Sequence, residues 1–250
     1  MLGYVLVRRA YIPHRSRPER RDRWPYTVPC IADLVGRGLE FPAPVTFLVG
    51  ENGSGKSTLV EAVAEAFKLD PHGGKAGNRY AHDGPPPSPL GEVLELDVTD
   101  RGRRMRSGPR SARKGFFLRA ETAFGFFEAV RGVPGFWSGD TTAMSHGEGF
   151  LTVFDQMLGG PGLYLFDEPE SALSFQSSLQ LVALMHELGR TGAQVICATH
   201  SPILASTPGA AIVEVGDHGT RQARWEDLDL VAQWRRYLTD PDLYLRHMIG

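Results

Sequence analysis

The run GENGSGKS at residues 50–57 has the clearest chemistry in the sequence, because it matches the pattern G-x-x-x-x-G-K-S/T in full. It follows an apolar, β-branched run at residues 44–49 and opens a segment with apolar residues at helical spacing, which is the context that the pattern requires. Its glycines let successive backbone N–H groups converge on one concavity, and the following helix would point its positive end at the same spot.

This loop predicts a triphosphate site. Lys56 would supply a charge for the β- and γ-phosphates, and the Ser57 hydroxyl could be a ligand for Mg²⁺. The alternative is a glycine-rich turn that packs a strand against a helix, which gives no reason for a lysine at that position. The expected nucleotide-binding residues are Gly50, Glu51, Asn52, Gly53, Ser54, Gly55, Lys56, Ser57 and Thr58.

A second pattern, LYLFDEPE at residues 163–170, places two acids directly after four apolar residues. A buried strand that ends in Asp167 and Glu168 would present both carboxylates at the carboxyl edge of a sheet, where open α/β sheets bind ligands. Asp167 would hold Mg²⁺ opposite Ser57, and Glu168 would orient and deprotonate an attacking water. Because neighbouring acids repel, a nearby cation would make the pair tolerable. The alternative is a solvated turn before Pro169.

The strands and helices that must position these residues are predicted to alternate along the chain. Apolar runs predict strands, and apolar residues at helical spacing predict helices. This alternation implies an α/β fold with a mainly parallel sheet. Residues 13–29 and 70–90 are expected to be loops. The expected strands are 2–9, 44–49, 92–98, 115–121, 163–166, 194–199 and 211–215, and the expected helices are 57–69, 122–130, 144–158, 173–188, 225–238 and 242–248.

Composition excludes several classes of protein. The 250 residues are 42% apolar, enough for a proper core, and the net charge of −2 argues against a polycationic nucleic-acid or membrane binder. Two cysteines, Cys30 and Cys197, exclude a disulfide scaffold. The apolar stretch at residues 4–7 is too short for a signal peptide, and 18 apolar residues never run together. We therefore expect a cytoplasmic protein without direct membrane insertion.

Taken together, the motifs resemble those of ABC-type ATPases, in particular the soluble, non-transport branch that includes chromosome-maintenance and RecF-like repair ATPases. SALS at residues 171–174 resembles the D-loop of that family, although the family more often ends it in Asp. CATHSP at residues 197–202 resembles the switch-histidine segment and would place His200 at the γ-phosphate. MSHGEG at residues 144–149 resembles a degenerate signature motif, in which Ser145 and Gly147 would bind ATP held by the opposite subunit. Ser145 with Glu148 also fits an ordinary capping box.

Two departures from the family are visible. No glutamine lies between Ser57 and Ser145, so the Q-loop residue is missing, and Glu121 stands where it would be expected and could reach the metal through water. Only 87 residues separate these two serines, which is too few for a long coiled-coil arm.

The resemblance implies one ATPase domain over residues 1–250, with an N-terminal antiparallel strand group. The core would comprise about 1–84 and 151–250, and a small inserted subdomain at about 85–150 would carry the signature. ATP and Mg²⁺ would bind, and two copies would enclose two ATPs. Hydrolysis would separate the copies, which makes a dimerisation switch acting on a protein or nucleic-acid partner. The alternatives are the nucleotide-binding subunit of a membrane transporter and a module that holds ATP without turnover.

Basic residues cluster at 101–114, with seven Arg or Lys and no acid. A nucleic-acid contact surface and a solvated hairpin turn are both compatible with this cluster. A second arginine group at residues 15–23 could lie near the nucleotide, where Trp24 and Tyr26 could stack on adenine or simply pack.

Overall fold

The computed structural model describes residues 5–16, 22–69, 74–75, 88–108, 114–119, 158 and 160–249. Its centre is a seven-stranded sheet in the order β10-β9-β3-β8-β7-β6-β4. The strands β9, β3, β8, β7 and β6 run parallel, and the two edge strands are antiparallel. These strands are β3 (Val45–Val49), β4 (Gly74–Lys75), β6 (Gly115–Arg119), β7 (Leu163–Asp167), β8 (Gln194–Thr199), β9 (Ala211–Gly216) and β10 (Gly219–Ala223).

The central strands are buried on both faces, which is why their sequences read as continuous apolar runs. Successive side chains of a strand enter two different cores. Phe166 packs with one cluster and Leu165 with the other, and Cys197 and Ile196 divide in the same way. The expected mainly parallel α/β sheet is therefore confirmed, and the predicted strands at 44–49, 163–166 and 194–199 coincide with β3, β7 and β8.

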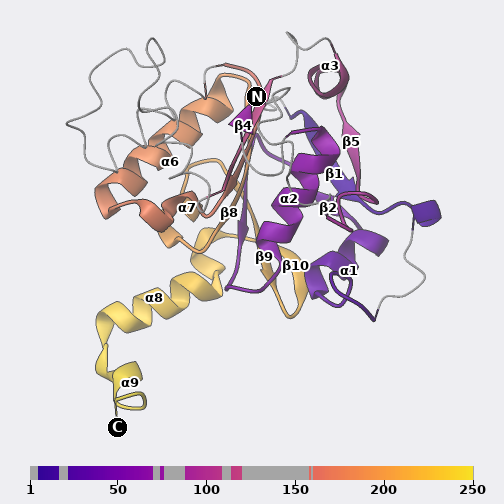
Figure 1. Cartoon of the computed structure of the whole chain (residues 1–250). Helices are drawn as coiled ribbons and strands as arrows, with labels where there is room; N and C mark the ends of the chain where they lie inside the picture. The colour runs from indigo at the N-terminus through magenta and orange to yellow at the C-terminus, as the bar shows by residue number, and fades with distance from the viewer. Residues whose placement is uncertain are drawn as a thin grey trace, which may run out of the picture.

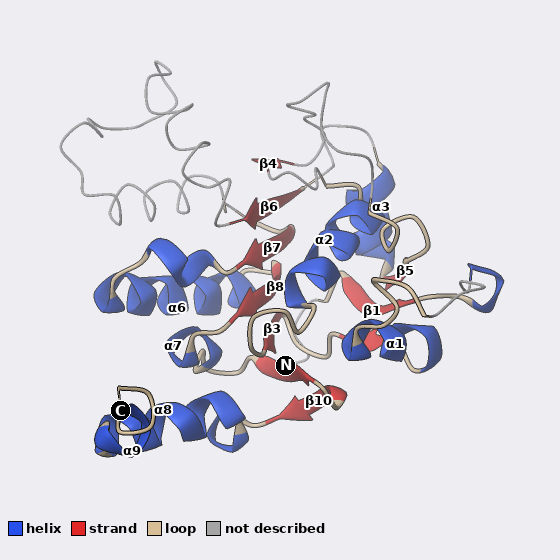
Figure 2. Ribbon diagram, turned by 60° about the horizontal axis from the view of Figure 1, so that its bottom comes forward, coloured by secondary structure: helices blue, strands red, loops and turns tan. Residues whose placement is uncertain are grey.

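Helices cover both faces of this sheet (Figures 1 and 2). α2 (Lys56–Phe67) and α1 (Pro29–Gly36) lie on one face, and α6 (Phe175–Arg190) and α7 (Pro202–Ala205) lie on the other. α2 and α6 match the helices expected at 57–69 and 173–188. A short 3₁₀ helix, η3 (Pro169–Ala172), connects β7 to α6. The segments expected as helices at 122–130 and 144–158 lie outside the described residues, except for Leu158.

An antiparallel sheet of three strands, in the order β2-β1-β5, packs beside α2 and confirms the expected N-terminal strand group. The strands are β1 (Val7–Tyr11), β2 (Leu39–Glu40) and β5 (Glu95–Val98). Both β5 and β6 fall within the 85–150 range expected as an inserted subdomain. Because β5 pairs with β1 and β6 pairs with β7, these two strands belong to the core rather than to an insert.

The basic stretch begins as a helix, α3 (Asp100–Ser107), and not as the charged turn that the sequence suggested. Thr99 starts it as an N-cap, since its side chain accepts a hydrogen bond from the N–H of Gly102. Gly102 is the residue that lets this helix approach β1, because a Cβ there would lie 2.3 Å from the carbonyl oxygen of Leu6. Asp100 also forms an ion pair with Arg103. The arginines of this stretch suggested a turn, although the N-cap at Thr99 starts a helix.

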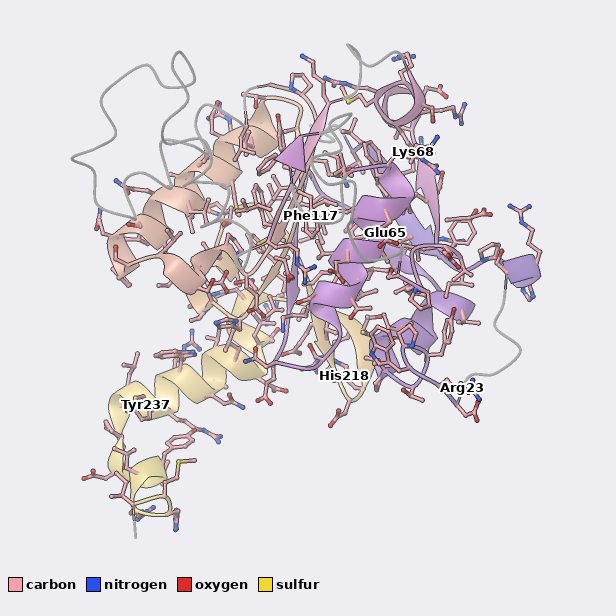
Figure 3. The ribbon with its side chains drawn as sticks, viewed as in Figure 1. Arg23, Glu65, Lys68, Phe117, His218 and Tyr237 are labelled. Atoms are coloured by element: carbon pink, nitrogen blue, oxygen red, sulfur yellow. The ribbon has the colours of Figure 1, made fainter. Side chains whose placement is uncertain are left out.

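The C-terminal segment leads away from the body of the molecule (Figure 1). η4 (Trp225–Asp227) is followed by α8 (Asp229–Thr239) and α9 (Asp242–Leu245), where the sequence predicted helices at 225–238 and 242–248. Figure 3 shows Tyr237 on α8 far from Phe117, which lies within the body. Among the described residues, no helix has the length and apolar character needed to cross a membrane.

Gln194, at the start of β8, joins the two sheets. Its side-chain oxygen accepts hydrogen bonds from the N–H groups of Leu6 (2.8 Å) and Val7 (2.7 Å), and its amide nitrogen donates to the carbonyl of Val7 (2.8 Å). The side chain is fully buried. The amide therefore serves as a strand partner for the segment that leads into β1.

We predict that Gln194→Leu lowers the free energy of unfolding by about 3 kcal/mol, because it leaves three buried backbone groups without these partners. Urea unfolding followed by circular dichroism measures this change. The matched control is Gln222→Leu on the exposed edge strand β10, which should stay within about 0.5 kcal/mol of the wild type. Equal stability of the two variants would contradict the role of Gln194.

Candidate functional site

The loop at residues 50–55 leads from the carboxyl end of β3 into α2, as the sequence predicts. Gly50 is held so close to β9 that a Cβ would lie 2.1 Å from the carbonyl oxygen of Val215. Gly53 and Gly55 have φ angles of +80° and +97°, a region that favours glycine. The loop therefore has the backbone form that a phosphate cradle needs.

Lys56 is the first residue of α2, and only 3% of it is exposed. Its Nζ donates to the carbonyl of Glu51 at 2.8 Å and lies 3.9 Å from Oε1 of Glu168. Burial lowers the pKa of Lys56, and the carboxylates of Glu168 and Asp167 oppose that change. The ammonium group is thus enclosed by the loop and faces the acids at the end of β7.

Ser57 and Asp167 form a direct pair, in which the Ser57 hydroxyl donates to Oδ1 of Asp167 at 2.8 Å. Asp167 is 7% exposed, and burial raises its pKa to about 6, against the lowering effect of the Ser57 hydrogen bond. Two oxygen atoms that could bind Mg²⁺ therefore lie next to each other.

Glu168 follows β7 in a left-handed backbone conformation, with φ 51° and ψ 49°. A non-glycine residue in this region is strained, and such strain clusters at functional sites. The strained backbone is held by a hydrogen bond from the N–H of Glu168 to the carbonyl of Ala198 (2.9 Å) and by one from the Ser171 hydroxyl to the Glu168 carbonyl (2.8 Å). Ser171 belongs to the segment predicted as the D-loop, and Ser174 of the same segment caps α6.

His200 directly follows β8, and its Nδ1 lies 3.5 Å from Oε1 of Glu168. The structure therefore places five predicted site residues at one edge of the sheet, as expected: Lys56, Ser57, Asp167, Glu168 and His200. β7 and β8 are adjacent in the sheet, with Asp167 in register with Ala198, which explains this convergence.

Sequence analysis missed the role of Glu170. This side chain is buried and accepts hydrogen bonds from the Thr199 hydroxyl and from the N–H of His200. Glu170 is the last letter of the LYLFDEPE pattern, but that pattern does not indicate its pairing with residues 199 and 200.

Arg119 and Glu61 were also missed. Arg119 ends β6 in register with Asp167, and its guanidinium forms an ion pair with Glu61 on α2. The positive charge of Arg119 lowers the pKa of Asp167, and the negative charge of Glu61 raises it. A basic group therefore stands beside the proposed metal ligand, two positions before Glu121.

Three predicted site residues, Glu121, Ser145 and Gly147, lie outside the described residues, so their expected roles stay predictions. Tyr26, one of the two aromatic residues proposed for adenine stacking, packs against the core beside α1. Trp24 is 62% exposed. Arg23, in the same loop, lies at the periphery of the molecule (Figure 3).

The residues present fit a nucleotide and Mg²⁺. The cradle excludes a Cβ at Gly50, and the loop holds a buried ammonium group at its centre. The Ser54 hydroxyl is buried and has no hydrogen-bond partner within the described part of the chain. A phosphate oxygen would satisfy these donors, and Ser57 with Asp167 would hold the metal.

Two family models match parts of the chain. One is described as "AAA domain, putative AbiEii toxin, Type IV TA system" and covers residues 149–206, and the other is described as "AAA domain" and covers residues 35–86. The first range contains Asp167, Glu168 and His200, and the second contains the phosphate loop. Over these two ranges, which hold the site residues described above, the chain is similar to P-loop ATPase domains of the AAA/ABC type.

Curated relatives include ABC transporter G family member 9 of Dictyostelium discoideum, which is 28% identical in an alignment of 207 residues that covers 72% of this chain and 14% of the relative. Another is the ribose import ATP-binding protein RbsA 2 of Burkholderia pseudomallei (strain 1710b), which is 28% identical in an alignment of 199 residues that covers 70% of this chain and 37% of the relative. The chain thus spans only a minor part of these relatives.

Similar solved structures include cbiO1 from Clostridium perfringens, with a TM-score of 0.47 and 14% identity over 82% of this chain and 88% of that one. They also include the SMC head domain from Thermotoga maritima, with a TM-score of 0.44 and 15% identity over 88% of this chain and 98% of that one.

We predict that Asp167 makes stability depend on pH in the absence of nucleotide and metal. Well below pH 3.8 this carboxyl is protonated in both states, and between pH 3.8 and about pH 6 the unfolded chain loses the proton more readily than the folded one, so stability falls as pH rises. The Asp167→Asn variant lacks this loss. Its free energy of unfolding, relative to the wild type, should rise by about 2 kcal/mol between pH 4 and pH 8. Denaturant unfolding of both proteins in EDTA at the two pH values measures this, and a difference that does not change with pH would contradict it.

Proposed function

We propose that this domain binds ATP with Mg²⁺ and hydrolyses it, and that it acts as a nucleotide-driven dimerisation switch on a partner protein or nucleic acid. The proposal depends on one observation, which is that the acids at the end of β7 and His200 lie next to the phosphate loop. Glu168 lies 3.9 Å from the ammonium group of Lys56 and 3.5 Å from Nδ1 of His200, and Asp167 accepts the Ser57 hydroxyl. A module that only holds ATP would need the loop and the metal ligands, but it would have no use for the strained acid beside a histidine.

The chemical step uses Glu168 as the base. Its carboxylate accepts a proton from water while the water oxygen bonds to the γ-phosphorus and the bond from that phosphorus to the ADP oxygen breaks. Lys56 offsets charge on the β- and γ-phosphates, and His200 donates to the γ-phosphate. Mg²⁺ held by Ser57 and Asp167 neutralises phosphate charge when it is bound. Glu168 is suited to this work because 28% of its side chain is exposed, so water can reach it.

In the dimer, Ser145 and Gly147 of one copy would bind the phosphates held by the other, and Glu121 would stand in for the Q-loop residue. We also propose that the chain forms a single domain, in which a small insert carries the signature motif. We propose that the protein is cytoplasmic. The exposed Arg103 and Arg104 on α3 offer contacts to nucleic acid phosphates.

A membrane transporter subunit is the second candidate, because the curated relatives include an ABC transporter and a ribose import ATP-binding protein. The absence of a Q-loop glutamine favours the first candidate, since the family uses that loop to contact membrane subunits. Purification as a stoichiometric complex with a membrane-embedded protein would favour the transporter subunit.

We predict that Glu168→Gln reduces the rate of phosphate release at least about a hundredfold, because the amide cannot accept the proton. Binding of a fluorescent ATP analogue should change less than about threefold, since Lys56 and the loop are intact. With ATP and Mg²⁺ the variant should elute as a dimer in size-exclusion chromatography, with or without added DNA or RNA.

The control is Glu187→Gln, an exposed acid on α6, which should keep the wild-type rate. Equal phosphate release by wild type and Glu168→Gln would refute the base assignment. A monomer under all conditions would refute the dimer, and a shift that needs DNA or RNA would identify the partner class.

A further inference from the structure

Glu170 connects the two sides of the proposed catalytic centre. It lies in η3, two residues after Glu168, and its Oε1 accepts hydrogen bonds from the Thr199 hydroxyl and from the N–H of His200, the latter at 2.9 Å. The same oxygen lies 3.8 Å from Nδ1 of His200. The Thr199 oxygen in turn accepts from the N–H of Ser201 at 2.9 Å. One carboxylate thus organises three consecutive residues where β8 ends.

The position of this acid is costly. Its side chain is 7% exposed, and burial raises the pKa of Glu170 against the lowering effect of its hydrogen bonds from Thr199 and His200. Oε2 of Glu170 and Nδ1 of His200 are both buried and lack a hydrogen-bond partner within the described ranges. A buried carboxylate usually persists where its charge or its hydrogen bonds are used.

Two carboxylates flank one ring nitrogen of His200. Oε1 of Glu168 lies 3.5 Å and Oε1 of Glu170 lies 3.8 Å from Nδ1, and the nearest basic group on the other side of Glu168 is Lys56. Because ionised carboxylates only accept hydrogen bonds, this arrangement favours a proton on Nδ1 and leaves Nε2 to the substrate.

We propose that Glu170 is a positioning residue, which fixes the backbone and the imidazole orientation of His200 next to Glu168. This inference rests on the proposed ATP hydrolysis and deepens it. The short connection after β7 therefore supplies the base, through Glu168, and also aligns the histidine, through Glu170. A carboxylate acting through the ring should affect turnover more than the binding of ATP, since its described hydrogen bonds come from Thr199 and His200, and only its charge acts on Lys56.

The test is a double-mutant cycle between residues 170 and 200, read by steady-state phosphate release at a series of ATP concentrations. Glu170→Ala should lower kcat about tenfold to a hundredfold and change the KM for ATP by less than about threefold. Glu170→Gln keeps the size and one accepting oxygen, so it should lose only about threefold to tenfold in kcat. In a His200→Ala background, either change at Glu170 should lower kcat by less than about twofold further, because the imidazole that Glu170 positions is absent.

The matched control is Glu214→Gln on β9. Glu214 is also buried and accepts a backbone N–H, from Asp229 at 3.0 Å, but it faces α8 and Arg221. This variant should keep kcat within about twofold of the wild type. If Glu170→Ala does not fold, Glu170→Gln carries the cycle. The positioning role alone would be overturned if the loss of kcat caused by a change at Glu170 were as large in the His200→Ala background as in the wild type. It would also be overturned if both Glu170→Ala and Glu170→Gln kept the kcat of the wild type. No phosphate release by the wild type would overturn the proposed function as well.

Discussion

A buried lysine and a buried aspartate lie at the carboxyl edge of the central sheet, and each needs neighbours that replace its lost hydration. Lys56 is 3% exposed and is compensated by the Glu51 carbonyl, while Asp167, at 7%, receives the Ser57 hydroxyl. The glycines are required because the chain must close around the ammonium group, and the parallel register is required because it brings the acid opposite the loop. The rest of the fold holds this small set of charges in place, out of water and within reach of one another.

Much of the architecture was predictable because its signals are local. β3, β7 and β8 are buried on both faces, so each reads as an apolar run, and α2 and α6 keep one apolar stripe each. One missed element, α1, does carry an apolar stripe, formed by Cys30, Ile31, Leu34 and Val35, but other missed elements lack such signals. β2 has two residues, β10 is a mostly polar edge strand, and α3 depends on a cap at Thr99 that its arginines obscure. Their conformations are set by pairing and packing with distant segments.

The site divides in the same way. Five predicted site residues belong to short motifs, and the structure brings them close together as the sequence predicts: Lys56, Ser57, Asp167, Glu168 and His200. Glu170 and Arg119 act through partners far along the chain, at Thr199 and Glu61, and only the strand order brings these together. A residue whose importance depends on sheet register gives little signal in a single sequence. Glu121, Ser145 and Gly147 stay predictions.

Gln194 links the second sheet to the proposed site, because it is the first residue of β8, the strand that His200 follows. Its carboxamide binds the amide hydrogens of Leu6 and Val7, at the opposite end of β8 from the nucleotide edge. These two hydrogens exchange with solvent only when the joint between the sheets opens. Their rate of hydrogen–deuterium exchange, measured by mass spectrometry, would therefore report whether nucleotide binding at the proposed site loosens or tightens the contact between the two sheets.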